Sequence, residues 1–407
     1  MDDLLTSAAA RQILAINGGS SSIKFALFAV ATDERVEPRR TLSGTIERIG
    51  QPGTALVVGG NGRAPQRREI AAANHEDAAE QLIEALRETL ESAALVGIGH
   101  RIVHGGAKLI EHQSVTDAVI AELKRTVPLD LTHLPREIAL IEIFARRLAG
   151  VPQFACFDTA FHRDLPRVAK LLPIPRRYFD SGVRRFGFHG LSYTYLLGEL
   201  LRIAPREADG RVIFAHLGAG ASMAAVQGGK PIDTSMAFTP TAGLVMATRP
   251  GDLDPGLIVY LMREEQLTPE KMDEWLNRNF GLLGVSETSP DVRDLLAARE
   301  KDSRAAEAID VFCYQARKWI GAYAAAMGGL EALVFSAGIG EHSPEVRTEI
   351  CAGLGFLDLR LDPARNDAAR GGAAAAVIST DDSRVAVRVI PTDEEIVIAR
   401  TVMALVG

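Results

Sequence analysis

ILAINGGSSSIKFALF, residues 13–28, contains two short apolar runs separated by a turn of Asn, Gly and Ser. Two such runs around a Gly-bearing turn are typical of a β-hairpin. Glycine lets the backbone bend sharply and approach a ligand closely. Backbone N–H groups and Ser hydroxyls are donors that can bind phosphate, and Lys24 adds a cation. The stretch therefore predicts a phosphate-binding hairpin, with an ordinary Ser/Gly hairpin as the alternative. It is not a Walker loop, because GxxxxGK[ST] is absent.

The same design recurs in the second half of the chain. Residues 211–226, RVIFAHLGAGASMAAV, again place a Gly-rich turn between two apolar runs. We interpret this as an internal repeat at the scale of a domain, in which each half begins with a phosphate-facing hairpin. Strands that alternate with helices elsewhere indicate an α/β fold.

Hydrophobic periodicity predicts the other main elements. Helices are expected over residues 75–94, 117–127, 135–149, 192–203, 255–280 and 302–328, and strands over 96–102, 153–158, 333–336 and 385–390. We predict a Gly turn at 337–342 and a loop or hairpin tip at 50–68. Thr392 with Glu395 three residues later has the spacing of a capping box at the start of the last helix.

The composition bounds the class of protein. The chain has 407 residues, is 47% hydrophobic and 24% charged, and has a net charge of −7. This profile is typical of a globular protein with one large or two ordinary domains. The acidic balance argues against nucleic-acid binding. No apolar run approaches the ~18 residues of a membrane span, and the acidic N-terminus does not resemble a signal peptide. The three scattered cysteines favour a reduced, cytoplasmic setting.

Six charged side chains occur where apolar segments end. They are Lys24, Arg101, Asp158, His189, Arg249 and Glu394. Phosphoryl transfer needs these residue types, because cations neutralise the transferring group and carboxylates hold Mg²⁺. The alternatives are surface ion pairs for the arginines, helix caps for the acids, and structural roles for His104, His133 and His216.

Ten ordered motifs carry a family resemblance from about residue 13 to the end of the chain. They are INGGSSSIKF, GHRIVHGG, FDTAFH, RFGFHGLS, HLGAGAS, DTSMAFTP, MATRPGD, SPDVRD, AGIGEH and VIPTDEE. With these motifs the chain resembles the acetate kinase family of the actin/Hsp70/sugar-kinase superfamily. The resemblance implies an α/β fold of two duplicated, ribonuclease-H-like (actin-like ATPase) domains that flank an active-site cleft. It places the N-terminal domain at 1–158 plus 394–407 and the C-terminal, nucleotide-binding domain at 159–393.

The reaction that the resemblance implies is reversible transfer of the ATP γ-phosphoryl group to acetate, which gives acetyl phosphate and ADP. ATP is then a co-substrate and Mg²⁺, or Mn²⁺ in its place, the metal cofactor. A cytoplasmic homodimer that binds neither nucleic acid nor a membrane is expected.

The resemblance also implies roles for individual residues. Arg101, Asp158, His189 and Arg249 would be catalytic, with His189 and Arg249 stabilising the transition state and His133 beside them. The acyl group would bind to Arg101, Val103, Phe188 and Pro240. The nucleotide and its phosphates would bind to Ser20, Ser22, Lys24, His216, Gly218, Gly220, Asp291, Arg293, Gly338, Ile339 and Gly340. The metal would be held by Asn17 and Glu394, with Asp158 helping to position it.

The chain departs from the family pattern at several of these motifs. HLGNGSS of the family is here HLGAGAS, with Ala219, and GIGEN is GIGEH, with His342. HGTSH is HGLSY, with Leu191 and Tyr193, and Thr132 stands where the acyl pocket has a Leu. These positions bear on the choice of nucleotide and acyl chain. Propionate or another short-chain acid is therefore an alternative substrate, and a non-acyl ATPase of the same superfamily is an alternative of another class.

Overall fold

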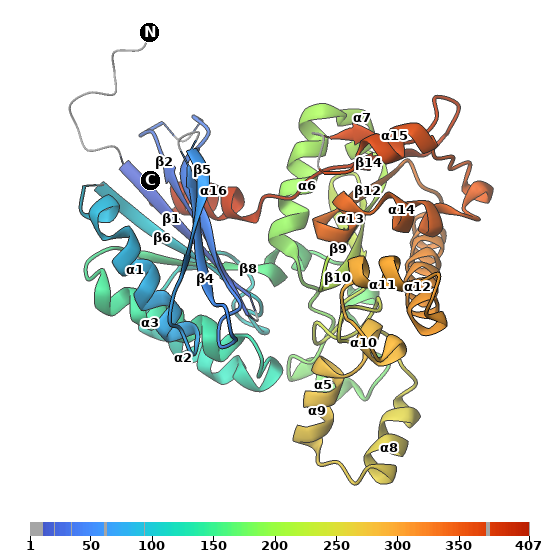
Figure 1. The fold of residues 1–407 in the computed structure, drawn as a ribbon, viewed down its shortest axis with the longest axis horizontal. Coiled ribbons are helices and arrows are strands. Elements are labelled where there is room, and N and C mark those ends of the chain that lie inside the picture. Colours follow the sequence, from blue (N-terminus) through green and yellow to red (C-terminus); the bar gives the residue numbers. More distant parts are fainter. Residues whose placement is uncertain are drawn as a thin grey trace. The chain divides into compact units, whose positions relative to one another are not determined.

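The computed structural model describes residues 11–19, 21–33, 35–60, 63–92, 94–371 and 375–406. The chain divides into two compact units. The first unit consists of Met1–Ala160 and Asp393–Gly407, and the second of Phe161–Thr392. Each unit is built around one β-sheet covered by helices (Figure 1).

The first unit contains an eight-stranded sheet in the order β5-β4-β3-β2-β1-β6-β8-β7. Its strands are β1 (Arg11–Gly18), β2 (Ile23–Ala29), β3 (Arg39–Glu47), β4 (Ala55–Gly60), β5 (Arg63–Glu69), β6 (Ala94–Ile102), β7 (Gln113–Ser114) and β8 (Gln153–Phe157). Strands β1 to β5 form an antiparallel meander, whereas β6 runs parallel to β1 and β8 runs parallel to β6.

The predicted hairpin at residues 13–28 is confirmed. Strands β1 and β2 pair antiparallel in a register that sets Asn17 opposite Lys24. The turn between them is closed by a hydrogen bond from the Gly19 N–H to the Ser22 carbonyl (2.8 Å). Ser20, at the centre of this turn, lies outside the described residues.

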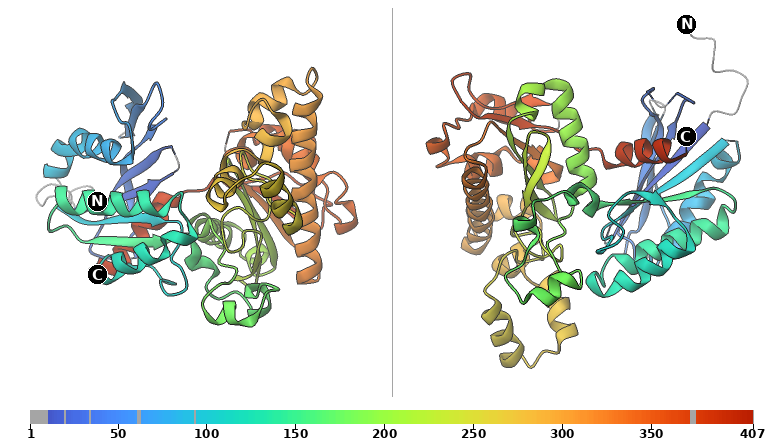
Figure 2. Two further views of the ribbon diagram at one scale, coloured as in Figure 1. Left: turned by 90° about the horizontal axis from the view of Figure 1, so that it is seen from below. Right: turned by 180° about the vertical axis from the view of Figure 1, so that it is seen from behind.

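Helices cover both faces of the first sheet (Figures 1 and 2). Leu14, Ile16 and Ile98 pack in one core with the apolar faces of α1 (His75–Ser92) and α3 (Leu134–Arg147). The other face carries α16 (Glu394–Val406), whose Ile398 and Val402 lie against Gly97 and Gly99 of β6. Any Cβ at these two glycines would fall within 3 Å of those side chains. Helix α2 (Asp117–Thr126) packs beside α3.

The second unit has a six-stranded sheet in the order β11-β10-β9-β12-β14-β13. Its strands are β9 (Arg211–Leu217), β10 (Ala221–Gln227), β11 (Lys230–Thr234), β12 (Ala332–Ser336), β13 (Ala376–Val377) and β14 (Ala386–Val389). The pairing repeats that of β3-β2-β1-β6-β8-β7 in the first unit: three antiparallel strands, two parallel strands, and a short antiparallel edge strand. The repeat expected from the two Gly-rich hairpins is therefore present in the topology.

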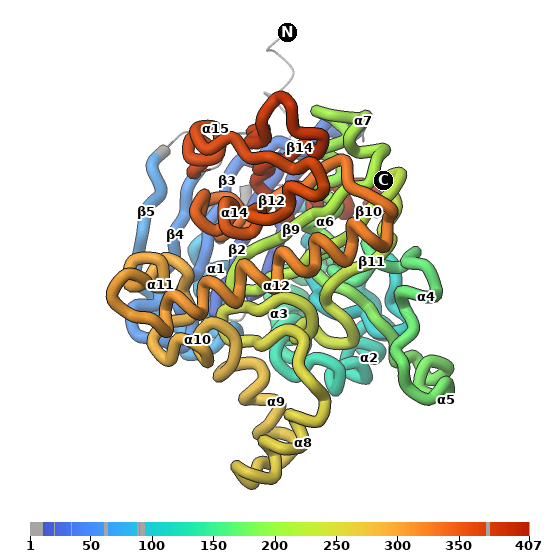
Figure 3. The backbone as a smooth tube through the Cα atoms, turned by 90° about the vertical axis from the view of Figure 1, so that its right-hand side faces the viewer, coloured from blue at the N-terminus to red at the C-terminus, as the bar shows by residue number. Residues whose placement is uncertain are grey.

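The helices of the second unit are more numerous. They are α4 (Arg167–Lys170), α5 (Arg176–Asp180), α6 (Gly190–Ile203), α7 (Pro205–Ala208), α8 (Pro255–Glu264), α9 (Pro269–Arg278), α10 (Gly281–Ser286), α11 (Val292–Ala298), α12 (Ser303–Met327), α13 (Ala337–His342), α14 (Pro344–Cys351) and α15 (Pro363–Ala368). Helix α12 crosses the sheet and packs on β9, β10 and α14 (Figure 3). Tyr193, Leu196 and Leu200 of α6 pack against another part of the same sheet.

Two local predictions of backbone conformation were wrong. Residues 55–60 and 63–69, expected in a loop or hairpin tip, form the paired strands β4 and β5. Residues 337–342, expected as a Gly turn, form the helix α13. Its first N–H, on Ala337, donates to the Glu341 carboxylate, and its last carbonyls accept from the buried guanidinium of Arg347. These bonds satisfy groups that a short helix leaves open, which offsets the poor helix propensity of Gly.

The predicted capping box is also wrong. Asp393, not Thr392, accepts a hydrogen bond from the N–H of Ile396 (3.1 Å) at the start of α16. Thr392 instead pairs with Ser192 and donates its N–H to Glu341. Glu395, which was predicted to be the second residue of the capping box, accepts a hydrogen bond from the Asn17 side chain (3.0 Å).

Candidate functional site

Arg101 lies at the centre of a polar cluster in the first unit. It comes from the end of β6, and its side chain is 13% exposed. Its Nη2 and Nε donate to Oδ2 of Asp158 at 2.6 and 3.1 Å, and Glu394 Oε2 lies 3.8 Å from Nε. Burial lowers the pKa of Arg101, but the carboxylates of Asp158 and Glu394 more than reverse this effect. Arg101 is therefore a fixed cation at every accessible pH.

The remaining donors of Arg101 reach the hairpin turn. Nη1 donates to Oδ1 of Asn17 (3.4 Å) and to the carbonyl oxygen of Gly18 (3.3 Å). Asn17 in turn donates from Nδ2 to Glu394 (2.8 Å) and Glu395 (3.0 Å). The cluster thus joins the ends of β1, β6 and β8 to the start of α16, where the parallel strands of the sheet end.

Two acids of this cluster, Glu394 and Glu395, share one amide donor. Burial, and next the charge of Glu394, raise the pKa of Glu395, while Lys24 opposes the shift. Lys24 itself is exposed on β2, and Ser22 lies just before that strand. The structure therefore brings Asn17, Lys24 and Glu394 to the same end of the sheet as Arg101.

Among the described residues, no group of three or more His, Cys, Asp or Glu side chains is arranged to hold a metal ion. Mg²⁺ does not require such a group, because it keeps several waters and takes one or two carboxylates plus phosphate oxygens of a substrate. The hard oxygen donors beside Arg101, those of Asp158 and Glu394, match this preference.

Val103 and Glu137 form a second contact behind the Arg101 cluster. Val103, two residues after Arg101, is buried, and its N–H donates to both carboxylate oxygens of Glu137 (3.2 and 3.0 Å). Burial raises the pKa of Glu137 well above its usual range, although the charge of Arg101 opposes the shift. No sequence motif marks Glu137, which follows Pro135 and Arg136 in the first turn of α3.

His189 of the second unit has a left-handed backbone (φ 57°, ψ 27°) at the start of α6. Such a conformation is uncommon for a residue with a Cβ and costs ~1–2 kcal/mol. The preceding residues hold it in place. Buried His162 donates from Nε2 to the Phe188 carbonyl (3.0 Å), and its ring fills the space that a side chain at Gly187 (φ +76°) would need. Strain of this kind is often found at functional sites.

The ring of His189 is fixed by two neighbours. Its Nδ1 is hydrogen-bonded to Oγ of Ser222 (2.9 Å), which is also bonded to the hydroxyl of Tyr193. The ring stacks on His216, with centroids 4.2 Å apart and an interplanar angle of 22°. His216 is held by Ser192 through Nδ1 (2.8 Å). The two predicted histidines therefore lie together, each oriented by a serine.

Arg249 lies against the same turn as His189. A Cβ placed on Gly220 would be 2.7 Å from Nη2 of Arg249 and 3.4 Å from Nε2 of His189. Arg249 also donates from Nη1 to the carbonyl of Pro240 (2.6 Å). Gly218 donates its N–H to the carbonyl of Gly220 (3.1 Å) and so closes the β9–β10 turn. The structure thus brings together Arg249, His189, His216, Gly218, Gly220 and Pro240.

The residues predicted to hold the adenosine end fall into two places. Asp291 caps α11, accepting from the N–H of Arg293 (2.8 Å), and the exposed Arg293 side chain folds back onto the same carboxylate. A helix cap explains this pair on structural grounds alone. Gly338, Ile339 and Gly340 lie on α13. A Cβ at Gly338 would meet nothing within 4 Å, so the space beside it is open.

The departures from the family pattern lie in different surroundings. Ala219 is exposed at the tip of the β9–β10 turn, and His342 is exposed at the end of α13. Thr132 is half-buried in the turn before α3, where its N–H donates to Asp130 (3.2 Å). Tyr193 is fully buried and bonded to Ser222, as described above.

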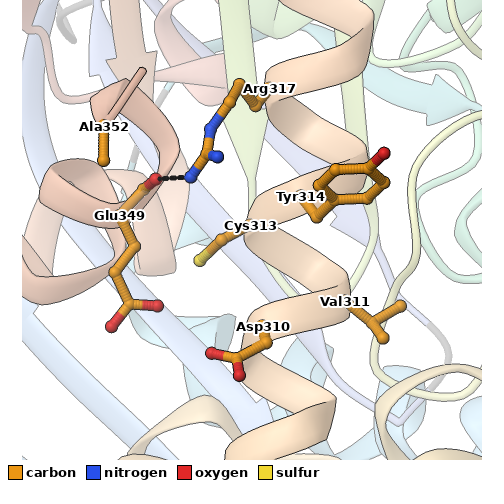
Figure 4. A pocket seen from close by; sticks show the side chains of 7 residues that line it. All are labelled: Asp310, Val311, Cys313, Tyr314, Arg317, Glu349 and Ala352. Carbon is orange, nitrogen blue, oxygen red and sulfur yellow. Dashed lines mark hydrogen bonds between the residues drawn. The ribbon is translucent and has the colours of Figure 1, made fainter. Parts of the chain in front are cut away.

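A separate pocket of about 490 Å³ lies on α12 and the end of α14 (Figure 4). Asp310 and Tyr314 line one side of it, and Glu349 lines the other, where the Arg317 guanidinium donates to the Glu349 carbonyl. None of its lining residues is among those predicted for the reaction. Cys313, at its base, is one of three buried free cysteines, as expected from the sequence.

In the described part of the chain, no helix is long and apolar enough to span a bilayer.

Comparison with known proteins identifies the family. The model of the acetokinase family matches residues 12–400. An acetate kinase of Rhodopseudomonas palustris is 43% identical over 395 residues, which covers 97% of this chain and 98% of the relative. The crystal structure of Porphyromonas gingivalis acetate kinase superposes with a TM-score of 0.84 at 35% identity, covering 98% of this chain and 100% of that one. A propionate kinase from Francisella tularensis gives 0.86 at 32% identity, covering 96% and 98%.

These likenesses confirm the predicted fold class, an α/β chain of two duplicated, actin-like domains. They also confirm the predicted class of enzyme, a phosphotransferase with a carboxyl group as acceptor. By sequence, topology and the charged groups at its strand ends, the chain belongs to the acetokinase family.

Proposed function

We propose that this protein is an acetate kinase that transfers the γ-phosphoryl group of ATP reversibly to acetate. The observation that carries the proposal furthest is the placement of Arg249 and His189 next to Gly220, in a Gly-rich turn. Two donors beside a turn of this kind match the needs of a transferring phosphoryl group, whose charge is spread over three oxygens. Family membership over residues 12–400 supports the same reaction.

The proposed chemistry is in-line attack by the acetate carboxylate on the γ-phosphorus. A carboxylate is already ionised at neutral pH, so no strong base is needed and catalysis comes from positioning and charge stabilisation. In this proposal Arg101 binds the acyl carboxylate and Arg249 the transferring phosphoryl group. His189 donates a hydrogen bond to that group in the transition state. Asp158 holds the Arg101 guanidinium in its orientation, as their two hydrogen bonds indicate.

We assign the remaining groups as follows. Ser20, Ser22, Lys24, His216, Gly218 and Gly220 bind phosphate, Asp291, Arg293, Gly338, Ile339 and Gly340 bind the nucleoside, and Val103, Phe188 and Pro240 enclose the acyl methyl group. Asn17 and Glu394 hold Mg²⁺, or Mn²⁺ in its place. The metal neutralises charge on the phosphate oxygens of the nucleotide. We also assign the nucleoside-binding residues to the C-terminal domain, 159–393, and we place the N-terminal domain at 1–158 plus 394–407.

The reverse reaction gives a direct test. Acetyl phosphate and MgADP should yield ATP, which luciferase detects, and Arg249→Ala should lower the rate at least ~100-fold, the scale of losing one transition-state donor. Arg206→Ala, on exposed α7, is the matched control and should leave the rate unchanged. Absence of ATP formation in the unsubstituted protein would contradict the proposal.

Propionate is the second candidate acceptor. One of the similar structures is a propionate kinase, and Thr132 replaces a Leu of the family's acyl pocket. One methylene in a pocket is worth ~1–3 kcal/mol, so kcat/KM for acetate should exceed that for propionate by about tenfold or more. A ratio below one would assign the protein to propionate instead.

We further propose that the protein is a cytoplasmic homodimer that uses α8 as part of its interface. Leu257, Val259 and Tyr260 of this helix are 38%, 48% and 56% exposed. Such exposed apolar groups mark interfaces, and a second copy is the simplest self-complementary partner. Light scattering should give twice the chain mass, and Tyr260→Asp should lower it while Tyr178→Asp, on α5, does not. A monomer in the unsubstituted protein would refute this assignment.

The free cysteines support the cytoplasmic location that we propose.

A further inference from the structure

Tyr193 departs from the family pattern at a position that touches the catalytic machinery. The resemblance places a His here, whereas this chain has a fully buried Tyr on the first turns of α6. Its hydroxyl is hydrogen-bonded to Oγ of Ser222, which is also fully buried on β10. Ser222 Oγ is 2.9 Å from Nδ1 of His189. The three side chains therefore form a chain of hydrogen bonds that ends on the imidazole.

The other nitrogen of that imidazole faces the reaction side. Nε2 of His189 and Nη2 of Arg249 both approach the position of a Cβ on Gly220, at 3.4 and 2.7 Å. A guanidinium can only donate hydrogen bonds. A neutral imidazole carries one proton, and the hydrogen bond made at one nitrogen determines whether the other nitrogen carries it.

The direction of the hydrogen bonds from Tyr193 through Ser222 to His189 follows from the strengths of the donors. A phenol (pKa ~10) is a better hydrogen-bond donor than an aliphatic hydroxyl, so Tyr193 donates to Ser222. Ser222 then has its own proton to give to Nδ1 of His189. With Nδ1 accepting, the single ring proton is on Nε2.

We propose that Tyr193, acting through Ser222, is a positioning residue that keeps His189 in the tautomer with the proton on Nε2. The consequence for catalysis rests on the proposed function: Nε2–H and Arg249 both donate to the transferring phosphoryl group. The opposite tautomer would direct a lone pair at that anion and remove one of the two donors.

Imidazole ¹⁵N NMR tests the tautomer without reference to activity. The His189 signal is assigned as the one lost in His189→Gln. In the unsubstituted protein we expect a non-protonated Nδ1 and a protonated Nε2. Tyr193→Phe, which keeps the ring and removes only the hydroxyl, should shift this pattern toward a mixture of tautomers. Tyr195→Phe, two residues along α6 and packed on the core of the unit, is the control and should not. A protonated Nδ1 in the unsubstituted protein, or no change in Tyr193→Phe, would overturn the proposal.

Kinetics test the consequence. Direct loss of a transition-state donor costs ~10²–10³ in kcat, so loss of its orienting partner should cost less, about tenfold. KM for ATP and for acetate should stay within about twofold, whereas a merely structural defect would also change KM and the melting temperature. If Tyr193→Phe does not fold, Ser222→Ala removes the same link. Should the unsubstituted protein form no acyl phosphate, the proposed function fails, while the NMR result still decides the tautomer.

Discussion

Removal of Arg101 should affect stability and catalysis by separable amounts. Arg101→Met keeps an unbranched, apolar side chain at the position but deletes the guanidinium, which is 13% exposed and pairs with the fully buried Asp158. Breaking a buried pair by removing one partner costs ~3–5 kcal/mol, because the other charge is left without compensation. We therefore expect the free energy of unfolding to fall by about that amount.

The double variant Arg101→Met/Asp158→Asn separates the two effects. It replaces the buried pair by neutral groups, which is often close to neutral for stability, so most of the lost free energy should return. Activity should not return, because the cation that binds the acyl carboxylate is still missing; kcat/KM should stay ~10²–10³-fold below that of the unsubstituted protein.

Urea titration followed by circular dichroism gives the stability, and formation of ADP with acetate gives kcat and KM. Arg206→Ala, at an exposed position of α7, is the control for both assays. Near-normal turnover in Arg101→Met, or recovery of activity in the double variant, would refute the role assigned to Arg101.

Three further predictions follow from single contacts. Gly220→Ala should lower kcat about tenfold with little change in melting temperature, because the added methyl displaces the ends of Arg249 and His189; Gly198→Ala, where a Cβ meets nothing within 4 Å, should be silent in the same assays. Burial lowers the pKa of His162 from 6.5 to about 4. As the pH drops, His162 is therefore protonated in the unfolded state before it is protonated in the folded state, and the free energy of unfolding should fall by about 3 kcal/mol between pH 6.5 and a pH below 4. His162→Gln, which can still donate to the Phe188 carbonyl, should flatten that slope by about one proton in urea titrations, and an unchanged slope would contradict the assignment. Burial raises the pKa of Glu137, so the folded state loses stability relative to the unfolded state as the pH rises above about 4.5. The free energy of unfolding of Glu137→Gln, relative to that of the unsubstituted protein, should therefore be higher at pH 8 than at pH 5. An equal difference at the two pH values would count against a raised pKa.

The sequence was most informative where local pattern and tertiary role coincide. The hairpin at 13–28 and its repeat at 211–226 each place a Gly-rich turn between two apolar runs, and both form the expected antiparallel pairs. The faces of α1 and α3 follow directly from apolar spacing. Arg101 and Asp158 lie together because the carboxyl ends of the parallel strands β6 and β8 meet at one end of the sheet. Glu394 joins them from the start of α16.

The failed predictions have different physical causes, and one of them is competition from groups far away in sequence. Thr392 has the right spacing for a cap, but Ser192 and Glu341 engage it, so the cap moves to Asp393. The Gly-rich segment 337–342 is helical because Glu341 within it and Arg347, on the next helix, satisfy its ends. The hydrogen bonds between Ser222 and His189 and between Glu137 and Val103 join residues 33 and 34 positions apart, so no local sequence pattern predicts them.

Phosphorylation of a carboxylate is tested most directly by trapping the acyl phosphate with hydroxylamine, with MgATP and acetate, propionate or butyrate supplied in parallel. Hydroxamate is expected with acetate, in amounts that fall as the acid lengthens, and the product should be lost in Arg101→Met and Arg249→Ala. A propionate preference would keep the mechanism and reassign the substrate. ATP binding without hydroxamate from any of the three acids would contradict the central claim that this chain phosphorylates a carboxylate.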